Sequence, residues 1–75
     1  DGKALLEYLD ALDPFTHEDT IFVLDDIRWS KSMLDSWNRL RASKTYHLSM
    51  DFFRLGILIK RPQQVKENFI LRFKK

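Results

Sequence analysis

Apolar residues near the start of the chain recur at helical spacing. Leu5, Leu9 and Leu12 lie four and three residues apart, so they share one face of a helix predicted over Lys3–Leu12. Pro14 follows directly and ends that helix.

A second amphipathic segment predicts a helix over Lys31–Arg41. Met33, Trp37 and Leu40 form its apolar stripe, with Leu34 beside them. Ser30 or Ser32 is available as the N-cap, because a serine hydroxyl can accept a hydrogen bond from the first turn. The spacing places Trp37 in the core.

Between the two helices, Ile21–Leu24 is a short continuous apolar run rich in β-branched and aromatic residues. Such a run is typical of a strand that is buried on both faces, as in a parallel sheet. We therefore expect a central strand there, covered on both sides.

The second half of the chain follows strand patterns. The segment Thr45–Phe53 alternates, and Gly56 marks a turn before a further strand over Ile57–Lys60. The last strand is predicted over Asn68–Phe73. In the alternating segment, one face carries Tyr46, Leu48, Met50 and Phe52, and the other carries Thr45, His47, Ser49 and Asp51. The predicted order is helix, strand, helix and three strands, which indicates an α/β fold that ends in antiparallel strands.

Composition limits the class of protein. The chain has 75 residues and no cysteine, so a disulfide framework and a thiolate metal site are excluded. We expect a reducing, cytoplasmic location. The apolar fraction of 44% is high for so short a chain, and predicts surface that meets a partner or a missing part of the same domain.

Charge and hydropathy argue against two classes of partner. A net charge of +2 is too small to predict nucleic-acid binding. No apolar run approaches the roughly 20 residues of a membrane span, and no signal peptide pattern opens the chain. We therefore expect neither nucleic acid nor membrane as a partner.

The adjacent acids Asp25 and Asp26 end the apolar run and are the main candidates for chemistry. In open α/β sheets, ligands bind beyond the carboxyl ends of the parallel strands. Two carboxylates there can hold a hard cation such as Mg²⁺, or one can act as a base. In the alternative reading, the two acids only open the loop into the next helix, where the helix dipole favours them.

Four other residues are weaker candidates. Trp29 could stack on a ligand, although a tryptophan at a loop–helix junction is also a common packing residue. His17 is expected to be a solvated surface residue, and His47 a half-exposed sheet residue. Asp51, among aromatic residues, is either a functional acid or a hydrogen-bonding group near a turn.

Phosphate-binding and nucleoside-binding motifs are missing. The chain has two glycines, and it contains no glycine-rich phosphate loop, zinc-protease motif, EF-hand loop or nucleophile elbow. This segment cannot by itself build a cradle for a dinucleotide or a nucleoside.

Three stretches together resemble the C-terminal part of class I S-adenosylmethionine-dependent methyltransferases. They are "TIFVLDDIRWSKSMLDSW", "SMDFFRLGILIKR" and "NFILRF", and the most specific piece is "DDIRWS" at Asp25–Ser30. The opening Asp1–Gly2 resembles the "DG" that ends the fourth strand of many such proteins.

The resemblance implies a topology. The helix over Lys3–Leu12 would follow strand four, and Thr20–Leu24 would be strand five. The strands over Thr45–Phe53 and Gly56–Lys60 would form the antiparallel pair that closes such sheets, with the later strand inserted next to strand five. The final "NFILRF" has no standard counterpart, and we expect it at the outer edge.

The resemblance also implies a site. In the metal-dependent O-methyltransferases that the chain resembles, acids at the carboxyl ends of strands four and five bind a divalent cation, which acidifies the acceptor hydroxyl. Asp1, Asp25 and Asp26 match these metal-binding positions, and Asp25 and Asp26 would be catalytic. Trp29 would contact the acceptor, a small molecule that carries a hydroxyl.

The family binds S-adenosylmethionine on its first three strands, and nothing in this chain corresponds to them. The expected fold is thus the C-terminal half of a Rossmann-like sheet, inactive in isolation, which the absence of an initiating Met also fits. Its strand edge would be unpaired, so we expect self-association into a homo-oligomer. The alternative is a self-contained α+β interaction module that binds a protein or an acidic surface.

Overall fold

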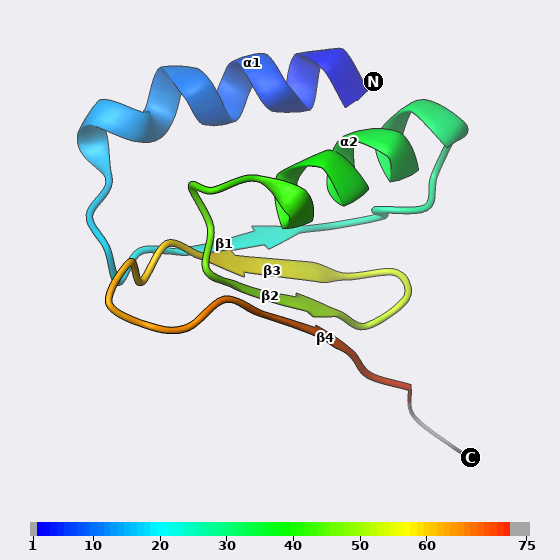
Figure 1. Cartoon of the computed structure of the whole chain (residues 1–75). Coiled ribbons are helices and arrows are strands. Elements are labelled where there is room, and N and C mark those ends of the chain that lie inside the picture. Colours follow the sequence, from blue (N-terminus) through cyan, green and yellow to red (C-terminus); the bar gives the residue numbers. More distant parts are fainter. Residues whose placement is uncertain (1, 73–75) are drawn as a thin grey trace.

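In the computed structural model, which describes residues 2–72, a four-stranded sheet carries two helices on one face (Figure 1). The prediction of an α/β fold is confirmed at this level. The elements are α1 (Gly2–Leu12), the 3₁₀ turn η1 (Asp13–Phe15), β1 (Ile21–Leu24), α2 (Lys31–Ala42), β2 (Leu48–Asp51), β3 (Gly56–Ile59) and β4 (Glu67–Ile70).

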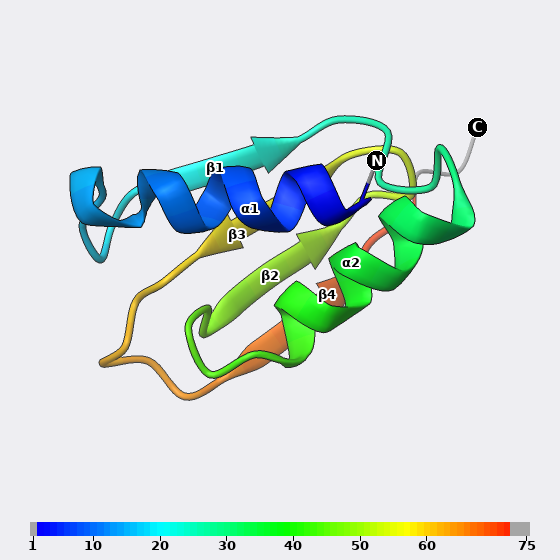
Figure 2. The same ribbon diagram turned by 90° about the horizontal axis from the view of Figure 1, so that it is seen from above.

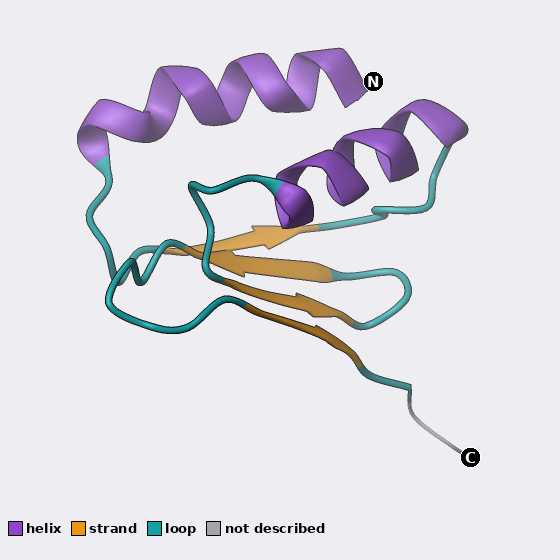
Figure 3. Cartoon of the chain, in the orientation of Figure 1, coloured by secondary structure: helices purple, strands orange, loops and turns teal. Residues whose placement is uncertain are grey.

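The strand order is β1-β3-β2-β4. β3 is antiparallel to both β1 and β2, whereas β4 is parallel to β2. The prediction that the chain ends in antiparallel strands therefore holds for β2 and β3 and is wrong for β4, because the chain crosses over before β4 and joins the far side of β2. β1, β2 and β4 therefore run in one direction, and their carboxyl ends meet at the edge on the right of Figure 3. Two predictions are confirmed: the later strand of the antiparallel pair is inserted next to β1, and the last strand lies at the outer edge.

The predicted helices are confirmed to within one residue at each end, as are the strands over Ile21–Leu24 and Ile57–Lys60. The other two predicted strands are too long. β2 covers only the middle of Thr45–Phe53, and β4 begins one residue before Asn68 and ends at Ile70. Phe73, the predicted end of that strand, lies outside the described residues. Ser30 is the N-cap of α2, and its side chain accepts a hydrogen bond from the Met33 N–H at 3.1 Å.

The core lies between the two helices and the face of the sheet that they cover (Figure 2). Trp37 is at its centre, fully buried, as predicted. Its ring approaches β3 so closely that a Cβ at position 56 would lie 2.7 Å from it, which explains the glycine there. The buried apolar residues are Leu9, Phe22, Leu24, Ile27, Trp37, Leu40, Tyr46 and Leu58.

The prediction that β1 is buried on both faces is wrong for the described residues. Ile21 and Val23 are 60% and 59% exposed, because both helices lie on the opposite face and nothing within residues 2–72 covers this one. β2 shows the same asymmetry, since Ser49 and Asp51 point toward the helices and are fully buried. The apolar side of that strand faces the uncovered side of the sheet.

No helix in residues 2–72 has both the length and the apolar character needed to cross a membrane.

Candidate functional site

The carboxyl ends of the three parallel strands bring several polar and aromatic residues to one edge of the sheet. Asp25 and Asp26 follow β1, Phe53 follows β2 and Arg72 follows β4. This is the edge at which open α/β sheets bind ligands.

A fully buried carboxylate, Asp51, organises this edge. The Arg28 guanidinium donates two parallel hydrogen bonds to it, 2.8 Å to Oδ1 and 2.7 Å to Oδ2. The Trp37 indole N–H donates to Oδ2 at 3.2 Å, and the Phe53 backbone N–H donates to Oδ1 at 2.8 Å. Asp51 is therefore paired and hydrogen-bonded, which is the condition under which a buried charge is tolerated.

These contacts shift the ionisation of the pair. The pKa of Asp51 lies well below its usual range, mainly because Arg28 donates hydrogen bonds to the carboxylate. The hydrogen bonds from Phe53 and Trp37 lower the pKa further. Burial acts the other way and is outweighed. The hydrogen bond to Asp51 in turn raises the pKa of Arg28.

Two further arginines stand near the same carboxylate. Arg41 Nη1 lies 3.8 Å from Asp51 Oδ2, and Arg72 Nη1 lies 3.7 Å from Oδ1. Arg41 also donates to the Ser49 hydroxyl at 3.2 Å, and that hydroxyl donates to Asn68 Oδ1 at 2.6 Å. This polar network connects α2, β2 and β4 on the covered face of the sheet.

The lowered pKa predicts an acid-labile fold. Asp51 binds a proton more weakly when folded than when unfolded, so its stabilisation is complete above the ordinary carboxyl pKa of about 4 and is lost as the pH falls below it. We expect the free energy of unfolding in urea to fall progressively as the pH is lowered from about 5 to about 2. The exposed variant Asp35→Asn should keep this slope, and a flat profile over the same range would contradict the prediction.

The structure brings Asp25, Asp26 and Trp29, three of the predicted site residues, close together. They line a depression of about 330 Å³ with Met33. Asp25 Oδ1 accepts a hydrogen bond from the Asp26 N–H at 3.0 Å, and Asp26 Oδ1 lies 3.3 Å from Arg54 Nη2. Trp29 is 80% exposed, so it is not a packing residue.

The alternative reading, in which the two acids open the loop into the next helix, agrees with their place between β1 and α2. Neither acid, however, caps the helix or lies in its first turn. Ser30 caps α2, and the first turn of that helix contains no acid. Asp25 and Asp26 instead hold the loop before the cap, where the Trp29 N–H donates to the Asp26 carbonyl at 2.9 Å. Asp26 adopts the left-handed backbone conformation, with φ 52°.

The residues present make an incomplete metal site. Within residues 2–72, no group of three or more histidine, cysteine, aspartate or glutamate side chains is arranged to hold a metal ion. Asp26 is already paired with Arg54, and Asp1 lies outside the described residues. The metal-binding role of Asp1, Asp25 and Asp26 stays a prediction.

The two histidines lie away from this edge. His17 is exposed, as expected, and its Nδ1 accepts a hydrogen bond from the Asp19 N–H at 3.1 Å. His47 is half-buried, which confirms the expectation, and its Nδ1 lies 3.1 Å from the Lys60 carbonyl oxygen.

A second depression at the same edge, of about 310 Å³, was not predicted from the sequence. It lies between the β1–α2 loop and the β2–β3 turn, which are joined by a hydrogen bond from the Ile27 N–H to the Arg54 carbonyl at 2.9 Å. Its lining residues are Asp26, Arg28, Trp29, Phe53 and Arg54. It shares Asp26 and Trp29 with the first depression, so the two adjoin.

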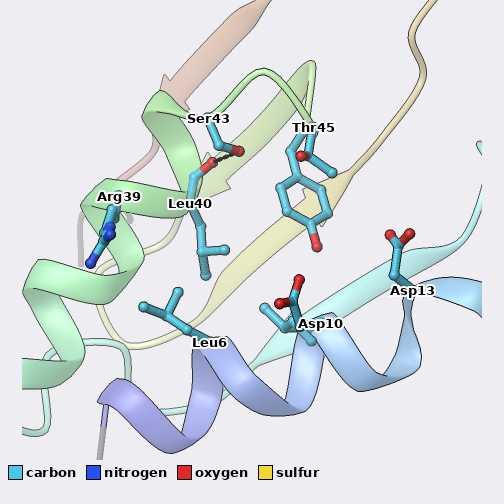
Figure 4. A pocket seen from close by; sticks show the side chains of 9 residues that line it. Leu6, Asp10, Asp13, Arg39, Leu40, Ser43 and Thr45 are labelled. Carbon is cyan, nitrogen blue, oxygen red and sulfur yellow. Dashed lines mark hydrogen bonds between the residues drawn. The ribbon is translucent and has the colours of Figure 1, made fainter.

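A third cavity, of about 350 Å³, lies at the other end of the molecule, between the C-terminal ends of α1 and α2 (Figure 4). Asp10 and Asp13 approach it from one side and Arg39 from the other. Tyr46 also lines it, and burial, followed by the charges of Asp13 and Asp10, raises the pKa of its hydroxyl. None of the residues predicted to be functional lies there.

Comparison of this chain with models of protein families, with curated proteins and with solved structures gives no match.

Proposed function

We propose that this chain forms the C-terminal half of a Rossmann-like, S-adenosylmethionine-dependent methyltransferase domain and supplies the acceptor side of its site. The observation that carries the proposal is the position of β3, which lies antiparallel between the parallel strands β1 and β2. The resemblance of "TIFVLDDIRWSKSMLDSW" and the following stretches implies this insertion. The order of helices and strands is also the one it implies.

The uncovered side of the sheet supports the same proposal. Within residues 2–72, β1 pairs only with β3, so its other edge can accept a further strand. Doubly wound sheets carry helices on both faces, whereas α1 and α2 cover one face here. The N-terminal half of the domain would pair with β1 and cover the exposed side chains of Ile21 and Val23. In isolation the chain would self-associate through this surface.

In this proposal the two halves of the domain bind different substrates. The absent strands bind the methyl donor, and the two adjoining depressions that share Asp26 and Trp29 receive the acceptor, with Asp25 and Asp26 next to its hydroxyl. The acceptor oxygen attacks the sulfonium methyl group, an O–CH₃ bond forms as the S–CH₃ bond breaks, and the hydroxyl proton passes to Asp25 or Asp26. A divalent cation such as Mg²⁺, when bound, would polarise that hydroxyl.

A second candidate function is a self-contained interaction module. The observation that favours it is the uncovered apolar face of the sheet, which could contact another protein. Such a module would need no upstream half and no donor site.

The coding sequence upstream of Asp1 distinguishes the two functions. The methyltransferase proposal predicts an upstream strand, a glycine-rich loop and, roughly 20 residues further on, an acidic residue. A start codon immediately before Asp1 would contradict it and favour the interaction module.

A further inference from the structure

Two aromatic side chains are displayed to solvent at the second depression, the one of about 310 Å³. Trp29 is 80% exposed and Phe53 is 52% exposed, and they line the depression from different loops. Exposed aromatic side chains that face one hollow are a common feature of ligand sites, because their flat faces bind rings.

The backbone at Phe53 is held in an unfavourable conformation. Its φ is 76°, in the left-handed region, where a bulky residue is a true outlier. Asp51 Oδ1 accepts from the Phe53 N–H at 2.8 Å, and Arg28 Nη1 donates to the Phe53 carbonyl at 2.5 Å. The ion pair of Arg28 and Asp51 thus holds the backbone of Phe53 at both its N–H and its carbonyl group. Strain that is held in this way is found at ligand-binding sites.

Three arginines supply positive charge beside the rings, and one of them, Arg72, lies over the Phe53 ring, 5.1 Å from its centroid. The three hydrogen bonds that Arg28 donates to Asp51 and Phe53 use three of the five N–H donors of its guanidinium. Arg54 is 79% exposed, and its contact with Asp26 Oδ1 at 3.3 Å is a weak surface pair that a ligand can displace. Arg28 also lies over the Phe53 ring, 4.8 Å from its centroid.

We propose that this depression binds a flat aromatic ring that carries a carboxylate. The ring stacks on Trp29 and contacts the exposed part of Phe53, and the carboxylate is bound by Arg54 together with the remaining donors of Arg28. The volume of about 310 Å³ is at the small end of the range for ligand pockets and suits one ring. Binding of the ring and carboxylate does not depend on the proposed function. Only the identification of a hydroxylated aromatic carboxylate as the methyl acceptor rests on it.

Titration of benzoate into the ¹⁵N-labelled chain tests the site without any methyl donor, so its result is independent of the methyltransferase proposal. We expect the indole N–H of Trp29 to shift with a Kd of about 1–10 mM, as befits a ligand of this size, while the buried indole N–H of Trp37 stays in place. Cyclohexanecarboxylate lacks the flat ring and benzyl alcohol lacks the charge. Each should bind at least about fivefold more weakly.

Two exposed substitutions complete the test. Trp29→Ala and Arg54→Gln should each weaken benzoate binding about fivefold or more, read at the Phe53 amide, and Arg61→Gln, an exposed arginine elsewhere, should not. The Trp37 indole signal reports that each variant is folded. Equal binding of benzoate and cyclohexanecarboxylate, or undiminished binding by Trp29→Ala and Arg54→Gln, would overturn the proposal.

Discussion

Replacement of Asp51 by alanine is expected to leave most of the protein unfolded at pH 7. The substitution leaves the Arg28 charge without its buried partner and removes the acceptor of the Trp37 indole N–H and the Phe53 N–H. Loss of one partner of a buried pair costs about 3–5 kcal/mol. A domain of under 80 residues has only about that much stability in total. Far-UV circular dichroism with urea titration measures the loss.

Asp35→Ala is the matched control. Asp35 forms an ion pair of 2.9 Å with Lys31 on the exposed side of α2. Surface pairs of this kind contribute at most about 1 kcal/mol, so this variant should unfold near the wild-type urea concentration. Similar small losses for Asp35→Ala and Asp51→Ala would contradict the central role given to Asp51.

Trp37→Ala is the second substitution with a large expected effect. The side chain is fully buried, packs against β3 at Gly56 and donates to Asp51, so its removal opens a cavity and breaks a buried hydrogen bond. A loss of about 3–5 kcal/mol in the free energy of unfolding is expected. Urea unfolding of the variant, followed by circular dichroism, gives the value.

The other tryptophan provides the control for this prediction. Trp29 is the same residue type but is mostly exposed, so Trp29→Ala should change the free energy of unfolding by no more than about 0.5 kcal/mol. A Trp29→Ala variant that is as unstable as Trp37→Ala would show that Trp29 packs against the fold, which would contradict its assignment to a ligand site.

The helices could be predicted from the sequence because their apolar residues repeat at one spacing and their boundaries carry Pro14 and Ser30. The sequence could not predict which face of the sheet the helices cover. Alternation in Thr45–Phe53 defines two faces, but the position of α1 and α2 decides which one is buried. The pattern favours burial of Leu48 and Met50, whereas the helices cover the face that carries Asp51.

The candidate site was predicted in part for a similar reason. Asp25, Asp26 and Trp29 lie close in sequence at the end of one strand, so their proximity follows from local structure. Arg28 and Asp51 are 23 residues apart, and their pairing depends on the tertiary fold. One signal in the sequence could have pointed to this pairing: the carboxylate of "MDFF" stands among aromatic residues, and a charge in such surroundings needs a partner.

The most direct test of the methyltransferase proposal is a calorimetric titration of S-adenosylmethionine, with and without Mg²⁺, into the longer protein that the proposal predicts, with further strands before Asp1. Micromolar donor binding by the longer protein, with none by the chain alone, is the predicted result. Loss of Mg²⁺ binding in the double variant Asp25→Asn/Asp26→Asn would show that these two carboxylates bind the cation. No donor binding by a folded longer protein would contradict the proposal.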